Sequence, residues 1–242
     1  MWKTIGGKCI YQAYNGAKVY QNHFYRWLTL NSDALQTLVN RRTPEKQGLG
    51  YIHQLAFAVR EDPSECCLLG LGGAGVAHAL APYLKQKRLL AIESNPQVIE
   101  IANTYFMTDR LKNLSIIHDN ANLFVRSNSM HFQHLMIDVF EANSFPLECS
   151  TFEFFTHCRH LLLPNGFLAL NLTNLDQQWQ LFYHIRNVFF QRTVILPVKG
   201  ASNMIVLACN SPTITPLLML LKASPLLKKL VWDAQLGCIA MI

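Results

Sequence analysis

The sequence predicts an α/β protein with a doubly wound, mostly parallel sheet that closes in an antiparallel hairpin and follows a small N-terminal β-unit. From residue 64 onward, short apolar runs alternate with helical patterns, as expected for parallel strands joined by helical crossovers. Near the C-terminus only the residues KGAS separate two apolar runs, so these runs must pair as a hairpin. The first 40 residues carry strand-like runs separated by turn signals.

The composition is that of an ordinary globular chain. Of its 242 residues, 50% are hydrophobic and 15% are charged, a balance that excludes a disordered polymer. No run of about 18 apolar residues occurs, so we expect no membrane-spanning helix. The N-terminus lacks the apolar core and cleavage site of a secretory signal, and we therefore expect a cytoplasmic protein. The net charge of +6 lies in short clusters, so we expect no nucleic-acid partner.

Cysteine and histidine form no metal-binding pattern. The seven cysteines include no C-x-x-C pair, the spacing that zinc cages and redox pairs use. Close histidine pairs such as His131 and His134 lack a third ligand at suitable spacing. We therefore expect no metal site. Cys66, Cys67 and Cys209 lie in apolar runs, and we expect them to be buried thiols.

The elements fall into two expected units, residues 1–46 and residues 47–242. The first unit has strand-like segments at 9–14, 18–30 and 34–39, with Asn-Gly and Asn-Ser-Asp turns between them. The second begins with a linking helix at 51–59. Its strands are expected at 64–72, 88–94, 114–120, 134–140, 166–172, 192–198 and 203–210. Its further helices are expected at 76–84, 96–106, 121–127, 151–162, 177–190 and 217–230.

A glycine-rich turn closes the first strand of the second unit. Gly70, Gly72, Gly73 and Gly75 stand in the segment GLGGAG, directly before a helix. Glycine lets the backbone turn tightly and brings the helix N-terminus close to a ligand. Glu93 ends the next strand, 23 residues after Gly70, where a carboxylate can accept hydrogen bonds from both hydroxyls of a ribose. The pair predicts a ligand that contains adenosine.

Two classes of ligand share this signature. Glycines spaced G-x-G-x-x-G and followed by an acid are typical of a nicotinamide dinucleotide site, and S-adenosylmethionine-type ligands use the same geometry. Three features favour the second class. Asp119 follows the third strand, where a carboxylate can meet the adenine amine, and Asp138 ends the fourth strand at the sheet edge that binds ligands. The closing hairpin is typical of methyltransferase-like sheets. We therefore predict a Rossmann-like domain that binds an S-adenosyl ligand.

Segments between about residues 20 and 210 resemble, in order, the spermidine synthase family of aminopropyltransferases and its bacterial spermidine synthase-like relatives. The matching segments are RWLTLNSDALQT, GYIHQLAF, CLLGLGGAGVAHAL, LLAIESNPQVIEIANTYF, IIHDNANLFV and MIDVFEANSFP. The resemblance implies a transferase that moves an aminopropyl group from decarboxylated S-adenosylmethionine to a diamine such as putrescine. It also implies a homodimer. No tightly bound cofactor is expected, because the S-adenosyl compound is a co-substrate.

The resemblance also implies roles for residues on the donor side of the site. Glu93 would hold the ribose, and Asp119, with Asn120 and Ala121 beside it, would contact the adenine edge. The glycine turn would lie against the donor. Gln36 would help hold the aminopropyl arm or the thioether.

On the acceptor side, the resemblance implies that Asp138 is the general base, that Glu141 binds the cationic amine and that Tyr51 lines the amine channel. The chemistry is physically reasonable. A sulfonium makes an attached carbon a good electrophile, so the enzyme mainly needs an oriented, neutral amine. Amines have pKa values of about 10 and are protonated near neutral pH. A pair of carboxylates can attract such an amine, and one member can take its proton.

Several positions depart from the family pattern. Gly73 stands where the glycine turn normally carries an acid, Ile52 where the helix tyrosine normally has a polar neighbour, and D-V-F-E-A where D-S-S-D-P is usual. Residues 197–203 lack a tyrosine that often closes the amine site. The missing acid removes a charge-assisted hydrogen bond worth about 1.5–3 kcal/mol.

Two alternatives therefore stay open: an S-adenosylmethionine-dependent methyltransferase, and a catalytically degenerate paralogue that binds an adenosyl nucleoside. Two observations weigh against the methyltransferase. Leu68 occupies a position that is usually acidic in methyltransferases, and no Asn-Pro-Pro-Tyr-like motif follows the fourth strand. Gly73 and Ile52 favour the degenerate paralogue.

Overall fold

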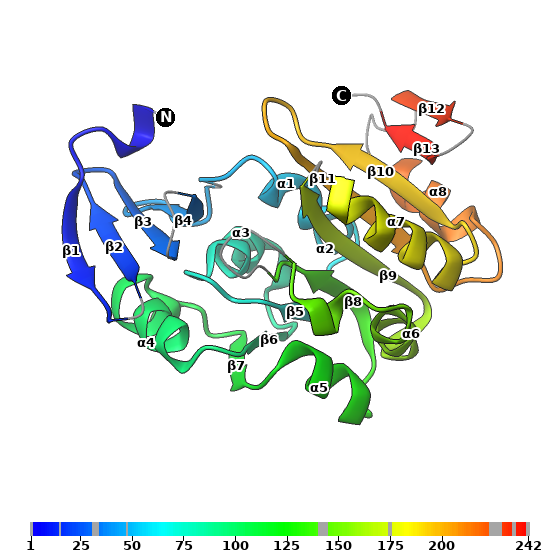
Figure 1. Ribbon diagram of the computed structural model, residues 1–242, viewed down its shortest axis with the longest axis horizontal. Helices are drawn as coiled ribbons and strands as arrows, with labels where there is room; N and C mark the ends of the chain where they lie inside the picture. Colours follow the sequence, from blue (N-terminus) through cyan, green and yellow to red (C-terminus); the bar gives the residue numbers. More distant parts are fainter. Residues whose placement is uncertain are drawn as a thin grey trace.

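The computed structural model describes residues 2–14, 16–30, 34–46, 48–139, 145–173, 176–222, 229–233 and 236–240. It has a small antiparallel sheet near the N-terminus and a large, mostly parallel sheet covered by helices (Figure 1). The predicted α/β fold is therefore confirmed. The described helices include none that is both long and apolar enough to cross a membrane.

The small sheet has four strands in sequential order after a short 3₁₀-helix, η1 (Trp2–Thr4). Its strands are β1 (Lys8–Gln12), β2 (Ala17–Gln21), β3 (Tyr25–Leu30) and β4 (Leu35–Asn40). The segment 18–30, which we expected to be a single strand-like unit, is two strands. Asn22 causes the break, because its side-chain oxygen accepts the N–H groups of Phe24 and Tyr25 at 3.0 and 2.7 Å. Such an Asx turn replaces the strand ladder locally.

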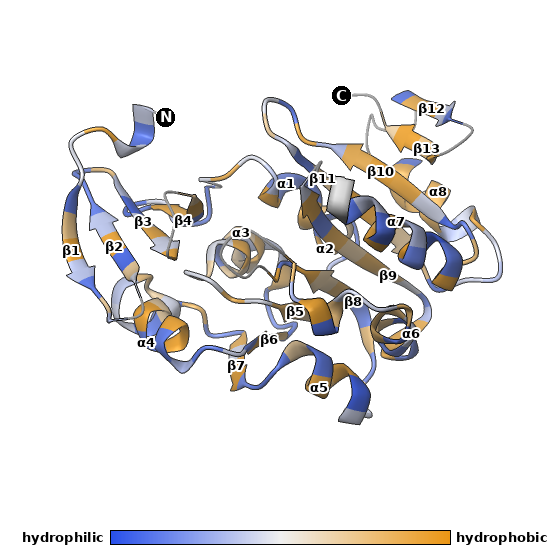
Figure 2. Ribbon diagram, in the orientation of Figure 1, coloured by the Kyte–Doolittle hydropathy of each residue, from blue (hydrophilic) through white to orange (hydrophobic). Residues whose placement is uncertain are grey.

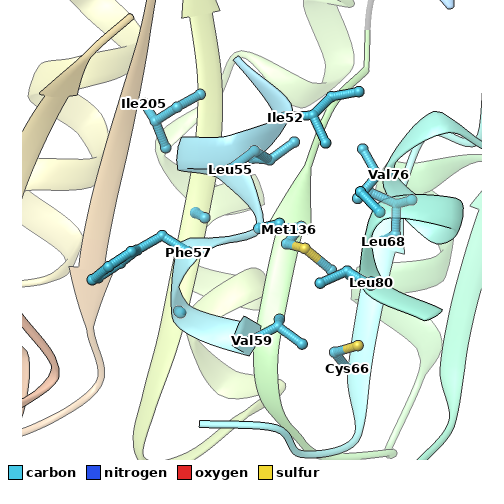
Figure 3. Packing of buried hydrophobic residues seen from close by; sticks show 14 of the residues in the cluster. Ile52, Leu55, Phe57, Val59, Cys66, Leu68, Val76, Leu80, Met136 and Ile205 are labelled. Atoms are coloured by element: carbon cyan, nitrogen blue, oxygen red, sulfur yellow. The ribbon is translucent and has the colours of Figure 1, made fainter. Parts of the chain in front are cut away.

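The connection to the large sheet is two short helices, where one helix over 51–59 was expected. They are α1 (Ile52–Leu55) and α2 (Phe57–Glu61). Figure 3 shows their side chains Ile52, Leu55 and Val59 packed close to Leu68 and Met136 of the large sheet. This packing places Tyr51, the residue just before α1, beside the edge of the large sheet where the parallel strands end.

The large sheet has nine strands in the order β12-β13-β10-β11-β9-β8-β5-β6-β7. The parallel part consists of β5 (Cys66–Leu69), β6 (Leu89–Glu93), β7 (Leu114–His118), β8 (Phe132–Ile137) and β9 (Leu162–Thr173). The predicted hairpin is present as β10 (Thr193–Pro197) and β11 (Asn203–Cys209), with β11 antiparallel to β9.

Helices follow the parallel strands as expected. They are α3 (Gly75–Leu84), α4 (Pro96–Tyr105), α5 (Ala121–Ser127), α6 (Phe152–His160) and α7 (Asp176–Val188). Two 3₁₀-helices, η2 (Thr108–Arg110) and η3 (Leu147–Cys149), lie in the connections. Asn95 caps α4 and Asn120 caps α5 by accepting backbone N–H groups of the first turn, a common way for a helix to begin.

The C-terminal tail differs from the helix expected over 217–230. Helix α8 (Thr215–Lys222) is followed by β12 (Leu230–Asp233) and β13 (Gly237–Ala240). Residues 223–228 lie outside the described part of the chain. Strand β13 pairs in parallel with β10, and β12 pairs with β13. Without these two strands, β10 would be an edge strand with unpaired backbone N–H and C=O groups, and such groups can pair with another strand. Strand β13 therefore pairs with β10, and β12 extends the sheet by pairing with β13.

The core lies on both faces of the large sheet. Strands β8, β9 and β10 are mostly hydrophobic (Figure 2), as expected for strands covered on both faces. Cys66, Cys67 and Cys209 are buried free thiols, as predicted. Burial raises the pKa of Cys66 to about 12 and that of Cys209 to about 11, so both are inert at neutral pH.

Candidate functional site

A cleft of about 1360 Å³ lies between the small sheet and the edge of the large sheet where the parallel strands end. Nine of the predicted site residues line it: Gln36, Tyr51, Gly70, Gly72, Gly75, Glu93, Asn120, Ala121 and Asp138. Gly73 and Asp119 are not among its described lining residues. Glu141 lies in 140–144, outside the described residues. Most of the predicted site thus converges on one cleft.

The glycine turn is shaped by a close approach to the end of β8. Gly70 has φ +91°, and a Cβ atom placed on it would lie 2.3 Å from the backbone oxygen of Asp138. No larger residue fits there without displacing the backbone. The Asp138 N–H donates to the Leu69 carbonyl at 2.8 Å, so the turn and the acid are fixed relative to each other.

Glu93 is held against the glycine turn by backbone groups. One oxygen accepts the N–H of Leu71 at 3.0 Å and that of Gly72 at 3.4 Å, and the other accepts the N–H of Asn95 at 3.0 Å. The carboxylate is half-buried and lines the cleft. A carboxylate has room for about four hydrogen bonds, so Glu93 can still accept from a ligand.

The side of the cleft beside β7 is formed by Asn120 and Ala121, not by the acid that precedes them. Asp119 uses one oxygen to accept the Asn120 N–H at 2.8 Å. The Asn120 side chain caps α5 and donates to Glu148 at 3.2 Å. Glu148 and Cys149 of η3 also line the cleft, and sequence reasoning missed both, because no motif marks this connection.

Gly73 and Ile52, two of the departures from the family pattern, take part in the packing of this chain. The Gly73 N–H donates to the Thr37 hydroxyl at 2.8 Å. A Cβ atom on Gly73 would lie 2.9 Å from Thr37 Cγ2 and 3.1 Å from a ring carbon of Phe106. An acid at this position would therefore meet packed side chains. Ile52 is buried in the core, and it lies against Gly75 of the same turn.

Asp138 is half-buried at the cleft, and side chains hold both its oxygens. The Tyr51 hydroxyl donates to Oδ2 at 2.8 Å, and the Asn171 amide donates to Oδ1 at 2.8 Å. Withdrawal from water raises the pKa of the Asp138 carboxyl, and the hydrogen bonds from Asn171 and Tyr51 oppose this rise. Burial and the neighbouring Asp138 carboxylate raise the pKa of Tyr51. The Tyr51 hydroxyl therefore keeps its proton and remains a hydrogen-bond donor.

Asn171 and Asn203 were not predicted from the sequence. Asn203 of β11 donates to the Asn171 oxygen at 3.0 Å, and both residues line the cleft. A signal was present: Asn171 interrupts the apolar run FLALNL near the end of β9, and Asn203 begins the otherwise apolar strand β11. A polar side chain in such a place needs a partner.

The charged groups that line the cleft are all acidic. They are Glu93, Asp138 and Glu148, and no Lys, Arg or His is present among the lining residues that the structure describes. The chain as a whole carries a net charge of +6, so the cleft is opposite in sign to the chain. A cleft of this kind attracts cations.

The order of the strands in the large sheet, the glycine turn after β5 and the cleft together define a methyltransferase-like α/β fold. No family model matches it. A polyamine aminopropyltransferase of Chromobacterium violaceum is 27% identical over 195 residues, covering 78% of this chain and 75% of that protein. A Drosophila melanogaster eEF1A lysine and N-terminal methyltransferase homolog is 29% identical over 137 residues, covering 51% of this chain and 20% of that protein.

Solved structures share the fold. A probable spermidine synthase from Corynebacterium glutamicum matches with a TM-score of 0.73 at 16% identity, covering 89% of this chain and 86% of that one. A spermidine synthase in complex with the transition-state analogue AdoDATO matches with a TM-score of 0.72 at 18% identity, covering 92% and 78%. Human methyltransferase-like protein 13 in complex with SAH has a TM-score of 0.62 at 16% identity, covering 77% and 96%.

These relatives confirm the resemblance to the spermidine synthase-like polyamine aminopropyltransferases, and the structures confirm the methyltransferase-like fold. The sequence relatives are transferases, and they support the prediction that this chain is an enzyme of that class. Two of the structural neighbours carry adenosyl ligands.

Proposed function

We propose that this chain is a spermidine synthase-like aminopropyltransferase, which transfers the aminopropyl group of decarboxylated S-adenosylmethionine to a diamine such as putrescine. The observation that carries the proposal is the Asp138 carboxylate, held at the cleft by Tyr51 and Asn171. A fixed carboxylate in an acidic cleft can both attract an ammonium ion and accept its proton.

In this proposal the donor lies along the ends of β5 and β6. Glu93 accepts the ribose hydroxyls, Asn120 and Ala121 flank the adenine, and Gln36 faces the aminopropyl arm or the thioether; all four residues line the cleft. Asp119 accepts the Asn120 N–H, and we propose that its other oxygen contacts the adenine amine. The acidic lining supports a donor without a carboxylate, because no described lining residue is a cation that could pair with one.

The reaction requires one proton transfer and one substitution. Asp138 takes a proton from the acceptor ammonium, and Tyr51 lines the channel through which the amine enters. The neutral nitrogen attacks the aminopropyl carbon next to sulfur, so a C–N bond forms. The C–S bond breaks, its electron pair stays on sulfur, and methylthioadenosine leaves. Glu141 is proposed to bind the far ammonium of the acceptor.

Two other functions remain candidates, each on a specific observation. A methyltransferase is favoured by the Drosophila relative. A degenerate adenosyl-binding paralogue is favoured by Gly73, where the acid that the family uses would require the side chains of Thr37 and Phe106 to shift.

Product masses distinguish the three functions. The full chain is incubated with putrescine and either decarboxylated S-adenosylmethionine or S-adenosylmethionine. We expect putrescine to gain one aminopropyl group from the first donor and nothing from the second. Methyl transfer from the second donor would contradict the proposal and support the methyltransferase. Calorimetric binding of methylthioadenosine without any product would support the degenerate paralogue.

The proposal extends to the setting of the enzyme. None of the seven cysteines, all of which lie in the described part of the chain, forms a disulfide bond, which agrees with a reducing cytoplasm. Strand β1 forms an edge of the small sheet, and its residues are mostly exposed; an edge of this kind can pair with a second copy. We therefore expect a cytoplasmic homodimer, with a mass of about twice 27.6 kDa by light scattering. A monomer at working concentration would contradict the dimer.

A further inference from the structure

A continuous hydrogen-bonded path runs from β11 to the carboxylate of Asp138. Asn203 donates to the Asn171 oxygen at 3.0 Å, and Asn171 donates to Asp138 Oδ1 at 2.8 Å. The residues come from the adjacent strands β11 and β9 and from the end of β8. The path therefore joins the closing hairpin to the proposed general base.

The direction of this path is determined by the carboxylate. An ionised carboxylate can only accept hydrogen bonds, so Asn171 must turn its NH₂ group toward Asp138. The Asn171 oxygen then faces the other way and needs a donor, which Asn203 supplies. Asn171 is 2% exposed, so bulk water is not at hand to take over either contact. Each amide thus has one orientation that satisfies its neighbour.

We infer that Asn203 is a positioning residue, which acts through Asn171 to fix the orientation of the Asp138 carboxylate at the cleft. Without a donor at position 203, Asn171 can turn its oxygen toward Asp138. Two acceptors would then face each other, and the carboxylate would lose its partner or bind a proton. Because Asn171 opposes the rise in the Asp138 pKa, its reversal makes that pKa rise further.

Other charged groups near the path are few. Tyr51 is the titratable side chain that donates to Asp138, and it opposes the rise in the same way as Asn171. Glu93 and Glu148 are the other charged groups lining the cleft among the residues the structure describes. Glu141, three positions beyond Asp138, is outside that part. None of these groups is changed in the variants below.

The inference deepens the proposed function, on which its catalytic meaning rests, and it is tested by a measurement that needs no substrate. Asn203→Asp keeps the shape of the side chain but can only accept hydrogen bonds, so it reverses the path. Carboxyl ¹³C NMR of the full chain, labelled at aspartate, reports the Asp138 pKa. Asp138→Asn assigns the signal. Asn187→Asp, on the exposed face of α7, adds the same charge away from the cleft and serves as the control.

We expect Asn203→Asp to raise the Asp138 pKa by about one unit, a tenfold change in the proton equilibrium. The control leaves it unchanged. A new charge at position 203 could also act directly through space, so the same change is made with Asn171→Leu present. In that background the path is already cut, and Asn203→Asp is expected to add little. An unchanged pKa in the single variant, or a full shift in the Asn171→Leu background, would overturn the inference.

Activity adds an independent readout. In Asn203→Asp, the acid limb of the pH profile of kcat/KM for aminopropyl transfer is expected to shift to higher pH, by as much as the Asp138 pKa rises. The affinity for methylthioadenosine is expected to stay unchanged. If the pKa shifts as expected but the wild-type chain transfers no aminopropyl group, the positioning role stands and the proposed function fails. If the wild type is active and the pKa does not shift, the proposed function stands and the positioning role fails.

Discussion

Glu93 and Asp138, two of the carboxylates that line the cleft, are held in different ways. Glu93 is held by backbone N–H groups of Leu71, Gly72 and Asn95, all within 22 positions along the chain. Asp138 is held by the side chains of Tyr51 and Asn171, which lie 87 and 33 positions away. The part of the cleft around Glu93 therefore depends on local backbone geometry, and the part around Asp138 depends on side chains that tertiary structure brings together.

This difference predicts that the two carboxylates affect different properties: Glu93 ligand affinity, and Asp138 the rate of reaction. A backbone-held acid tolerates changes in the surrounding side chains, because its donors do not depend on them. A side-chain-held acid changes its ionisation whenever a partner is removed, and Asp138, withdrawn from water, is sensitive to each loss. We therefore expect changes at the Glu93 end to alter ligand affinity, and changes at the Asp138 end to alter the rate and its pH dependence.

The largest effect is expected for Asp138→Asn. Without a proton acceptor, the rate of aminopropyl transfer is expected to fall about 1,000-fold, within the usual contribution of general base catalysis. The affinity for methylthioadenosine, measured by calorimetry, is expected to stay within a few-fold. Asp109→Asn, an exposed change in η2, is the control and should keep full activity. Turnover that survives in Asp138→Asn would show that another group takes the proton.

Gly70→Ala tests the close approach between the glycine turn and the backbone of Asp138. The added Cβ would lie 2.3 Å from the Asp138 oxygen, at φ +91°, so we expect a loss of about 3 kcal/mol in the free energy of unfolding. Gly200→Ala is a matched control, because its φ is +72° but nothing lies within 4 Å of the added carbon. It is expected to cost about 1 kcal/mol from backbone strain alone. Equal losses in urea denaturation would contradict the close approach at Gly70.

Glu93→Ala is expected to weaken every adenosyl ligand alike. The loss of hydrogen bonds to a charged group is worth about 1.5–3 kcal/mol, or about 10- to 100-fold in Kd. Calorimetry with S-adenosylmethionine, its decarboxylated form and methylthioadenosine measures this loss. Glu100→Ala, on an exposed position of α4, provides the comparison and should bind as the wild type does. Unchanged affinity in Glu93→Ala would refute the assignment of the ribose site.

Tyr51→Phe is expected to have the smallest effect and to depend on pH. The tyrosine hydrogen bond opposes the rise in the Asp138 pKa, so its removal raises that pKa further. The base works only when deprotonated; the acid limb of the rate profile therefore moves to higher pH. We expect about a tenfold loss on that limb and recovery at alkaline pH. A loss that is the same at every pH would indicate that Tyr51 contacts the substrate instead.

The backbone-built end of the cleft could be predicted from the sequence. Gly70, Gly72 and Glu93 are close in sequence, and their spacing follows from a strand, a turn and a helix. Asp138 could be placed as well, since the carboxyl ends of parallel strands share one edge. Asp119, Asn120 and Ala121 were all expected beside the adenine, and of these Asn120 and Ala121 line the cleft, with Asn120 also capping α5. The contact of Asp119 with adenine stays a prediction.

The side-chain-built end could not be predicted in the same way. Asn171 and Asn203 lie side by side because β9 and β11 are antiparallel neighbours in a particular register. Neither segment of the sequence, taken alone, indicates this pairing or its register. The break at Asn22 and the strand at Leu230 were missed for related reasons. A side-chain oxygen decided the first, and an available strand edge decided the second.

The central claim is that the cleft binds a sulfur-bearing adenosyl nucleoside with its sulfur next to Asp138. A crystal structure of the protein soaked with methylthioadenosine tests this most directly. We predict ribose hydroxyls within hydrogen-bonding distance of Glu93, adenine beside Asn120 and Ala121, and sulfur on the side of Asp138. A nucleoside bound elsewhere, or bound in the cleft with its sulfur directed away from Asp138, would contradict the claim.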